Sequence, residues 1–352
     1  MPPHELFDIS GAFTYSPGHI QAAKGPRFMQ MQDVFRLFGE DLKQVEMHME
    51  AYLRSEVRLI TEIIRHIIDS GGKRFRPLLL LAASDLCGYN GDRRYPLAAV
   101  IEFIHTATLL HDDVIDEADV RRGKAAANRV WGNAASVLVG DFLYSKSFRL
   151  LTEYGNLDII KLLSTTTNTM SEGEVLQLIK RGDVSITEAD YLSIIDKKTA
   201  VLISAACALG GHLGEFEPKR IDALAQYGLR VGAAFQMTDD TLDYIAQENE
   251  FGKAIGKDLE EGKLTLPLIR TMTQASEEER IRMQTLLGKK ERTPEDIGAI
   301  ITLMNRYDGI DYTLAKAGRL IAEAKEFLAP FPDCCAKASL ITTADYIIER
   351  KI

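Results

Sequence analysis

The helical spacing of apolar residues dominates this sequence from about Met31 onward and limits its fold more than any other feature. In "VFRLFGEDLKQVEMHMEAYLRSEVRLITEIIRHIID", apolar residues recur three and four positions apart over many turns, which is the pattern of amphipathic helices. The alternation and hairpin turns that mark β-strands are scarce. Since no low-complexity linker or short repeat divides the chain, we expect one all-α domain over residues 31–352.

The first thirty residues differ from the rest. They hold four of the eleven prolines and show no sustained period, so we expect residues 1–30 to form a loosely ordered arm. Glu5 and Asp8 interrupt any signal-peptide pattern. The most apolar runs, "PLLLLAASDL" and "TAVLISAACALGG", are too short to span a bilayer and are typical of buried helices. We therefore expect a cytoplasmic protein without a transmembrane segment.

Composition argues against nucleic-acid binding and against a structural role of the cysteines. A net charge of −9 argues against a general nucleic-acid binder, which would carry a basic face. The four cysteines form no C-x-x-C pair and have no histidine-rich neighbours, so neither a zinc site nor a disulfide framework is indicated.

Two copies of the pattern D-D-x-x-D each lie in an apolar helical stretch. Their members are Asp112, Asp113, Asp116, Asp239, Asp240 and Asp243. Residues four apart share one helix face, and carboxylates gathered in this way repel one another unless a cation lies between them. One copy alone is common on solvated surfaces. Two copies favour Mg²⁺, which takes one or two carboxylates together with substrate phosphate oxygens.

Basic residues lie in four segments of the chain, and Arg121 and Arg122 follow the first acidic triplet by about one helical turn. These segments are "GGKRFRP", "VRRGK", "DKKTA" and the late loop "FGKAIGKDLEEGK". A charge run is usually a solvated face, and Arg93–Arg94 fits that description. Lys73 and Arg76 differ because they directly precede the apolar "PLLLL". Such cations suit phosphate oxygens through charge-assisted hydrogen bonds, so the pattern predicts a diphosphate ligand.

Seven motifs in order give the chain a specific resemblance. They are "GGKRFRP", "HTATLLHDDVIDEADVRRG", "GNAASVLVGDFLYS", "SEGEVLQL", "KKTA", "FQMTDDTLDY" and "GKDLEEGKLTLP". From about Arg54 to Pro267 the chain resembles the trans-isoprenyl diphosphate synthases. It is most similar to the long-chain bacterial branch, such as the octaprenyl diphosphate synthases.

The resemblance implies ten or more mostly antiparallel helices around a deep central cavity, usually in a homodimer. It implies that two or three Mg²⁺ ions are held by Asp112, Asp116, Asp239 and Asp243, supported by Asp113 and Asp240. It assigns isopentenyl diphosphate to Lys73, Arg76, His105 and Arg122. It assigns the allylic diphosphate to Arg121, Lys198, Thr199, Gln236 and Lys253.

The implied reaction is the ionisation of an allylic diphosphate, attack by the isopentenyl double bond and loss of a proton. Fixed dipoles such as the Thr199 hydroxyl and Gln236 would stabilise the transient cation. No protein side chain is an obvious base, and bound pyrophosphate is the alternative. Polar groups confined to the mouth of an apolar cavity would keep water away from that cation.

Product length is predicted from Ala107 and Thr108, which lie one turn before Asp112. By similarity, short-chain enzymes close the cavity with bulky aromatic residues here, and these two small residues would leave it open. We expect about eight isoprene units from a farnesyl starter, for a quinone side chain. Nine or ten units, or a shorter farnesyl or geranylgeranyl product, are the alternatives. The alternative interpretation is that both residues have only a structural role in helix packing.

Other classes of protein fit less well. A class I terpene cyclase normally has a mixed Asn/Ser/Glu second motif and needs no isopentenyl site. A regulatory subunit of a heteromeric prenyl synthase typically loses its aspartates, whereas this chain keeps all six. We expect no transmembrane anchor, with peripheral membrane contact for release of a long product.

Overall fold

This computed structural model describes residues 29–245, 256–289 and 292–349. The first helices are α1 (Met31–Leu37), α2 (Gly39–Tyr52), α3 (Arg58–Ile68), α4 (Phe75–Leu86) and α5 (Arg94–Ile115). The middle of the chain forms β1 (Val120–Arg121), β2 (Lys124–Ala125), α6 (Ala127–Trp131), α7 (Asn133–Tyr154), α8 (Leu157–Lys180), α9 (Glu188–Ile195), the π-helix η1 (Asp196–Ala200), α10 (Val201–Leu213) and α11 (Pro218–Ile245). The last elements are α13 (Lys257–Glu260), α14 (Leu266–Gln274), α15 (Glu277–Leu287), α16 (Pro294–Arg306), α17 (Gly309–Phe327) and α18 (Cys335–Glu349).

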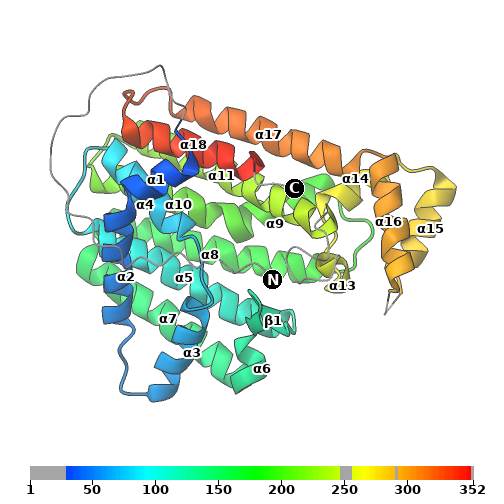
Figure 1. Cartoon of the computed structure of the whole chain (residues 1–352), viewed down its shortest axis with the longest axis horizontal. Helices are drawn as coiled ribbons and strands as arrows, with labels where there is room; N and C mark the ends of the chain where they lie inside the picture. Colours follow the sequence, from blue (N-terminus) through cyan, green and yellow to red (C-terminus); the bar gives the residue numbers. More distant parts are fainter. Residues whose placement is uncertain (1–28, 246–255, 290–291, 350–352) are drawn as a thin grey trace, which may run out of the picture.

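The expected all-α architecture of ten or more helices is confirmed (Figure 1). The single departure within the described residues is the antiparallel pair β1–β2, in which Arg121 pairs with Lys124. Arg122 and Gly123 form its two-residue turn with φ of 51° and 78°. Positive φ at both central residues is the signature of a type I′ hairpin turn. The hairpin turns the two adjacent arginines toward different partners, as described below.

Local signals explain where several helices begin. Thr187 and Thr293 each form a capping box at the start of α9 and α16, and the Asn156 side chain accepts the N–H of Ile159 at the start of α8. These side chains satisfy amide groups that have no partner inside the helix. The helix starts are therefore set by the sequence itself.

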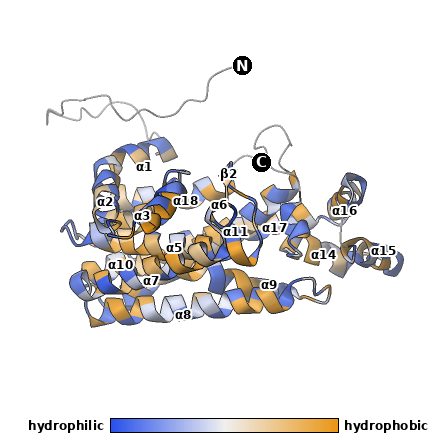
Figure 2. Cartoon of the chain, turned by 90° about the horizontal axis from the view of Figure 1, so that it is seen from below, coloured by the Kyte–Doolittle hydropathy of each residue, from blue (hydrophilic) through white to orange (hydrophobic). Residues whose placement is uncertain are grey.

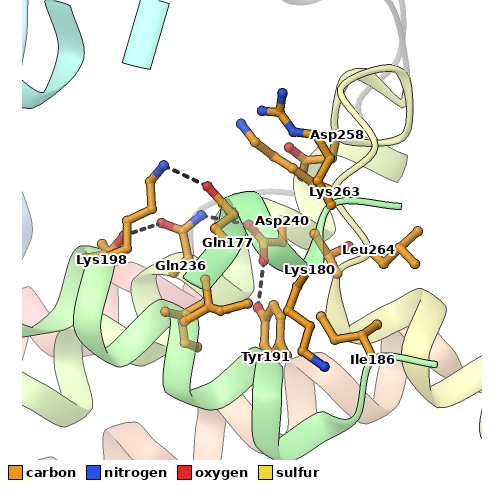
Figure 3. Close-up of a pocket in the computed structure, with 15 residues that line it drawn as sticks. Gln177, Lys180, Ile186, Tyr191, Lys198, Gln236, Asp240, Asp258, Lys263 and Leu264 are labelled. Atoms are coloured by element: carbon orange, nitrogen blue, oxygen red, sulfur yellow. Dashed lines mark hydrogen bonds between the residues drawn. The ribbon is translucent and has the colours of Figure 1, made fainter. Parts of the chain in front are cut away.

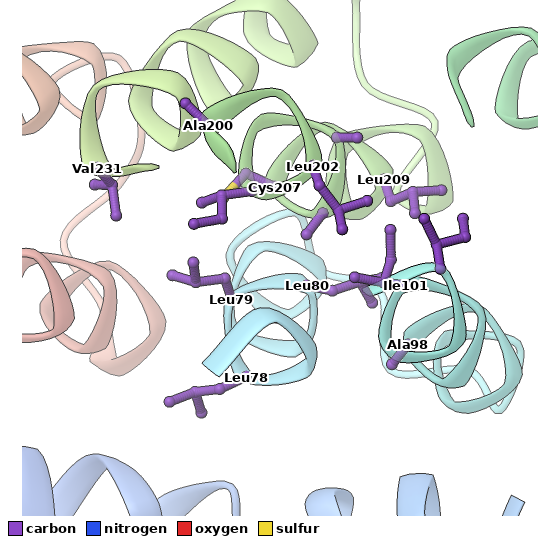
Figure 4. Close-up of a cluster of buried hydrophobic side chains, with 14 of the residues drawn as sticks. Leu78, Leu79, Leu80, Ala98, Ile101, Ala200, Leu202, Cys207, Leu209 and Val231 are labelled. Carbon is purple, nitrogen blue, oxygen red and sulfur yellow. The ribbon is translucent and has the colours of Figure 1, made fainter. Parts of the chain in front are cut away.

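The centre of the molecule is a layer of apolar helices. Along α4, Leu78 to Leu81 are fully buried, and α10 is buried along nearly its whole length. In Figure 4, Leu79 and Leu80 lie between α4 and α10, with Leu80 beside Ile101 of α5, and Leu78 points to the opposite side of α4. The two short apolar runs are thus buried helices, as the sequence predicts. In the described residues no helix is long and apolar enough to cross a membrane.

A second, smaller core supports the end of the molecule where α15 and α16 stand (Figure 1). It gathers Leu259, Leu268, Met283, Ile300 and Met304 from the segment after α11. This core fixes α13 and the loop that follows it, which carries Lys263. Figure 2 shows α8 as an outer layer on one side of the bundle. The predicted N-terminal arm lies outside the described residues up to residue 28.

Candidate active site

The first acidic triplet lies at the carboxyl end of α5, where Asp116 is the C-cap. Its middle member, Asp113, is 1% exposed and accepts hydrogen bonds from Arg121 Nε at 2.9 Å and Nη2 at 2.5 Å. Burial raises the pKa of Asp113, and Arg121 opposes that rise. Asp113 therefore faces the protein and holds the β1–β2 hairpin in place, while Asp112 and Asp116 lie on another face.

Asp116 is gripped by two cations from distant loops. Arg181 Nη2 pairs with one carboxylate oxygen, and Lys263 Nζ donates to the other at 2.7 Å. Burial alone would raise the pKa of Asp116, but Lys263, Lys198 and Arg181 outweigh it and lower that pKa. The two loops are joined because the Gly182 N–H donates to the Gly262 carbonyl at 2.9 Å. This carboxylate is thus ionised and held in a cationic setting.

Lys198 connects the first triplet to helix α8. Its Nζ lies 3.5 Å from Asp112 Oδ2 and donates to Glu174 Oε2 at 2.7 Å and to Gln177 Oε1 at 2.8 Å. Burial and the charge of Asp112 raise the pKa of Glu174. Lys198 consequently stands at the centre of an acidic wall, where it offsets the repulsion between carboxylates.

The second triplet lies near the end of α11 and presents its members differently. Asp239 is exposed, whereas Asp240 is 7% exposed and points into the protein. Tyr191 Oη donates to Asp240 Oδ2 at 2.6 Å, and Gln236 Nε2 donates to Oδ1 at 2.7 Å. Burial raises the pKa of Asp240 to about 7 even though both hydrogen bonds oppose the rise.

Asp243 is linked to the loop after α11. Its Oδ2 accepts the backbone N–H of Asp258 at 2.9 Å, and its own carbonyl accepts the N–H of Gly256. Burial, and then the charges of Asp240 and Asp243, raise the pKa of Asp258 well above its ordinary value. A fourth carboxyl group therefore joins the three of the second triplet.

The π-helix η1 places Lys198 and Thr199, and two glycines allow it to lie where it does. A Cβ on Gly173 of α8 would come within 2.7 Å of Lys198 N, and one on Gly232 of α11 within 2.6 Å of Ala200 Cα. Real Cβ atoms essentially never approach so closely. Only glycine at both positions lets α8 and α11 enclose η1 from two sides, and π-turns of this kind often occur at functional sites.

One pocket joins these groups (Figure 3). Its volume is about 640 Å³, including the part open to solvent. Lys198 and Thr199 of η1, Gln236 and Asp240 of α11, and Lys263 line it. Asp240 of the second triplet lines this pocket, and so do Lys198 and Lys263, which contact Asp112 and Asp116 of the first triplet. Ile186, Ile194, Ile195 and Leu264 give it an apolar part.

A second cationic group, the arginine cluster, consists of Arg74, Arg76 and Arg122 around His105. Arg74 Nη1 lies 3.2 Å from Glu102 Oε1, and a Cβ on Gly72 would lie 2.9 Å from Arg122 Nη1. Burial lowers the pKa of Arg76 and of Arg122; the charge of Glu102 opposes this, and neighbouring guanidinium groups lower both pKa values further. Three guanidinium groups face only two carboxylates, Glu102 and the more exposed Glu46, so the cluster keeps a net positive charge that favours an anion.

The remaining predicted residues are placed as follows. Lys73 Nζ donates to Tyr346 Oη of α18 at 2.6 Å, which brings the last helix to the "GGKRFRP" segment. Ala107 is buried, and the Thr108 hydroxyl donates to the His105 carbonyl at 2.8 Å. Neither lines the pocket of Figure 3. Lys253 lies outside the described residues.

The acidic groups do not form a closed metal cage. Among the residues that the structure describes, no three or more His, Cys, Asp or Glu side chains converge in a metal-binding arrangement. Mg²⁺ usually binds one or two carboxylates and completes its shell with water and substrate phosphates. The oxygen donors of Asp112, Asp116, Asp239 and Asp243 are of the type that the ion requires.

Sequence reasoning gave no role to several residues of this pocket. Tyr191 has the spacing of a core residue, and its partner Asp240 lies 49 positions away. Arg181 follows α8 in a polar loop that carries no motif. Glu174, Gln177 and Asp258 do fall in two quoted motifs, "SEGEVLQL" and "GKDLEEGKLTLP", and those motifs were the available signal.

Comparison with known proteins shows the family of the chain. The family model for polyprenyl synthetase matches residues 57–304. The octaprenyl diphosphate synthase of Escherichia coli is 39% identical over 92% of this chain and 99% of its own length. A crystal structure of a decaprenyl diphosphate synthase from Rhodobacter capsulatus superposes with a TM-score of 0.87 at 40% identity, covering 91% of this chain and 99% of that one.

A further structure holds ligands of the expected kind. The polyprenyl synthase from Caulobacter crescentus, complexed with calcium and isoprenyl diphosphate, superposes with a TM-score of 0.88 at 38% identity over 93% of this chain and all of that one. The region that the polyprenyl synthetase model matches, residues 57–304, contains both acidic triplets and η1. The chain therefore belongs to the polyprenyl synthetase family and is a prenyltransferase of that family.

Proposed function

We propose that this protein is a Mg²⁺-dependent trans-polyprenyl diphosphate synthase that adds isopentenyl diphosphate repeatedly to an allylic diphosphate, starting from farnesyl diphosphate. The observation that carries the proposal is the pocket that Asp240 of the second triplet lines together with Lys198 and Lys263, the partners of Asp112 and Asp116 in the first triplet. A prenyltransferase of this type must hold two diphosphates, and the chain offers two separate cationic places for them.

The allylic diphosphate belongs at the pocket of Figure 3. Asp112 and Asp116 at one side, and Asp239 and Asp243 at the other, would hold Mg²⁺, which when bound neutralises the charge of the departing pyrophosphate. Lys198 and the remaining allylic-side cations, Arg121 and Lys253, would add donors to the phosphate oxygens. The complex of the Caulobacter relative with calcium and isoprenyl diphosphate supports a divalent cation and an isoprenyl diphosphate as ligands of this chain.

Isopentenyl diphosphate belongs at the arginine cluster together with Lys73. The lowered pKa values of Arg76 and Arg122 mean that each guanidinium is more stable beside an anion than in the empty cluster. The pKa of His105 is lowered well below its ordinary value by burial and by four arginines, so the imidazole is neutral and can offer one N–H. Bidentate arginine donors match phosphate geometry well.

The chain's own groups then favour transfer over hydrolysis. Apolar side chains around the pocket exclude water from the developing allylic cation. Thr199 and Gln236 place fixed oxygen dipoles beside it without offering a strong nucleophile. No described side chain in the pocket is an unpaired base of suitable strength, so we assign the final proton to the released pyrophosphate.

We propose a product of about eight isoprene units, C40. Buried Ala107 and half-buried Thr108 leave the α5 face before Asp112 without a bulky side chain. Similar relatives carry the names octaprenyl and decaprenyl synthase, so C45–C50 is the next alternative and a shorter product the third. A quinone side chain is the use that we assign to such a product.

We also propose a homodimer. Large apolar side chains are exposed on α7 and α8, with Leu138 67%, Val175 57% and Ile179 69% exposed. An apolar outer layer of this kind is typical of a protein–protein contact. A long prenyl product would leave by peripheral contact with a membrane.

Two-substrate kinetics test the separation of the two diphosphate sites. We expect Arg122→Gln to raise KM for isopentenyl diphosphate by roughly tenfold, because it removes charge-assisted hydrogen bonds, with the allylic KM within twofold. Asp112→Asn should instead raise the Mg²⁺ requirement and lower kcat. Arg36→Gln, with a side chain 79% exposed on α1, is the control. Equal effects of Arg122→Gln on both substrates would contradict the proposal.

A further inference from the structure

A chain of four hydrogen-bonding side chains crosses the pocket. Tyr191 Oη donates to Asp240, the Gln236 amide donates to the other oxygen of Asp240, and Thr199 Oγ1 donates to Gln236 Oε1 at 2.9 Å. Figure 3 shows Tyr191, Asp240 and Gln236 in this order, with the chain continuing toward η1. All four side chains line the pocket.

The direction of this chain follows from its acceptor. Tyr191 Oη donates to one carboxyl oxygen of Asp240 and Gln236 Nε2 donates to the other, so Asp240 is the acceptor in both hydrogen bonds. The Gln236 amide nitrogen is then turned toward Asp240, and its carbonyl oxygen is turned toward Thr199. Because a carbonyl oxygen can only accept, the Thr199 hydroxyl donates its proton to the Gln236 carbonyl oxygen. Thr199 can therefore present only the lone pairs of its oxygen, and not its proton, to the pocket.

Tyr191 is the fixed end of the chain. It is 3% exposed, and α9, which carries it, is closed at its start by the capping box of Thr187 and Asp190. Burial, and then the charge of Asp240, raise the pKa of Tyr191 well above its ordinary value, so the phenol keeps its proton and remains a donor. Without this donor, one oxygen of the buried Asp240 carboxylate would have no partner.

We propose that Tyr191 is a positioning residue that holds Asp240 as an acceptor and thereby makes Thr199 face the reacting allylic carbon with oxygen lone pairs. This inference rests on the proposed function, since it concerns the positive charge that develops during transfer. A hydroxyl oxygen directed at that charge stabilises it, whereas a hydroxyl proton directed at it would destabilise it. Asp240 therefore acts on Thr199 indirectly, because it fixes the direction in which Gln236 and Thr199 donate their hydrogen bonds.

The first test removes the phenol alone. Tyr191→Phe should lower kcat by roughly ten- to hundredfold, less than the roughly 100- to 1,000-fold for removing a group that touches the reacting atoms, because Tyr191 acts through Asp240 and Gln236; the KM for the allylic diphosphate should stay within twofold. Tyr227→Phe is the matched control, because Tyr227 is fully buried and its hydroxyl donates to the Leu340 carbonyl at 2.7 Å. That control should lower the melting temperature and leave kcat unchanged. An unchanged kcat in Tyr191→Phe would overturn the proposal.

The second test reverses the chain. In Asp240→Asn, the new amide can donate to Gln236, which then donates to Thr199 and turns the Thr199 proton into the pocket. Thr199→Val should lower kcat in the wild type but leave it unchanged or raise it in the Asp240→Asn background. Residues of one hydrogen-bond network couple in any case, but with a structural or metal-holding role of Asp240 we expect Thr199→Val still to lower kcat in the Asp240→Asn background, so only the change of sign is specific to direction.

The outcomes distinguish this inference from the proposed function. If the wild type is active and Thr199→Val lowers kcat by the same factor in the wild-type and Asp240→Asn backgrounds, this inference is overturned and the proposed function stands. A folded wild type that does not elongate farnesyl diphosphate refutes the proposed function and this inference with it. Calorimetric binding of inorganic pyrophosphate with Mg²⁺ to each variant checks that the site itself remains intact.

Discussion

Substituting Gly173 by alanine should disturb the site without removing any of its polar groups. The added Cβ would lie 2.7 Å from Lys198 N, 2.8 Å from Lys197 Cβ and 2.9 Å from Lys197 C. Ordinary contact begins at 3.4 Å, so α8 and η1 must separate by about 0.7 Å (3.4 − 2.7) at this point. Two of the three atoms belong to the backbone, which cannot turn aside as a flexible side chain can.

That displacement falls on Lys198 and Thr199, to which we assign the allylic diphosphate. Lys198 is held to Glu174 and Gln177 by hydrogen bonds of 2.7 and 2.8 Å, and Thr199 to Gln236 by one of 2.9 Å. A misplacement of about 1 Å can cost roughly 100-fold in rate. For about 0.7 Å we expect kcat to fall roughly ten- to 100-fold, with a loss of about 1–3 kcal/mol in stability from overpacking.

The assay is steady-state elongation at saturating substrates, with thermal unfolding measured in parallel. Gly318→Ala is the control, because Gly318 lies inside α17 and a Cβ there meets nothing within 4 Å. Alanine in a helix interior should stabilise the control by about 0.5–1 kcal/mol and leave kcat unchanged. Wild-type kcat and stability in Gly173→Ala would refute the close approach of α8 to η1.

Two further predictions concern α5. Thr108→Phe should shorten the product toward C15–C20, because a phenyl ring one turn before Asp112 would close the proposed path of the chain; an unchanged product length by mass spectrometry would reject the role of this face. The lowered pKa of His105 means that protons favour the unfolded chain, whose His pKa is 6.5, so stability should fall as pH drops below that value. Between pH 6.5 and 5.5 the free energy of unfolding should fall by about 1 kcal/mol for one histidine. Denaturant unfolding should show this fall in the wild type and not in His105→Gln. An equal loss in both proteins would count against a neutral, buried His105.

Much of the fold could be predicted from the sequence because its signals are local. The three- and four-residue spacing of apolar residues marked the helices, and "PLLLL" marked α4 as a buried one. The hairpin of β1 and β2 was missed because strands of two residues show no alternation. Its only signal was the Arg122–Gly123 pair, in which glycine suits the positive φ of the turn.

The sequence motifs indicated the charged residues of the candidate site but not their hydrogen-bond partners. The D-D-x-x-D spacing pointed to Asp112 and Asp239 directly. The spacing could not reveal that Asp113 and Asp240 face inward, since their partners Arg121 and Tyr191 are chosen by tertiary packing. The π-turn of "DKKTA" was also invisible, because it depends on two glycines on other helices. Residue types predicted the chemistry, and the packing of α8, α9 and α11 decided the geometry.

The most direct test of the account is the product formed by the purified wild-type chain. It should be incubated with farnesyl diphosphate, isopentenyl diphosphate and Mg²⁺, and the products sized by mass spectrometry over time. We predict successive five-carbon additions that depend on the metal and accumulate at about C40. Absence of any elongation by the folded protein would contradict the central claim, and a product that stops at C15 or C20 would contradict the long-chain assignment.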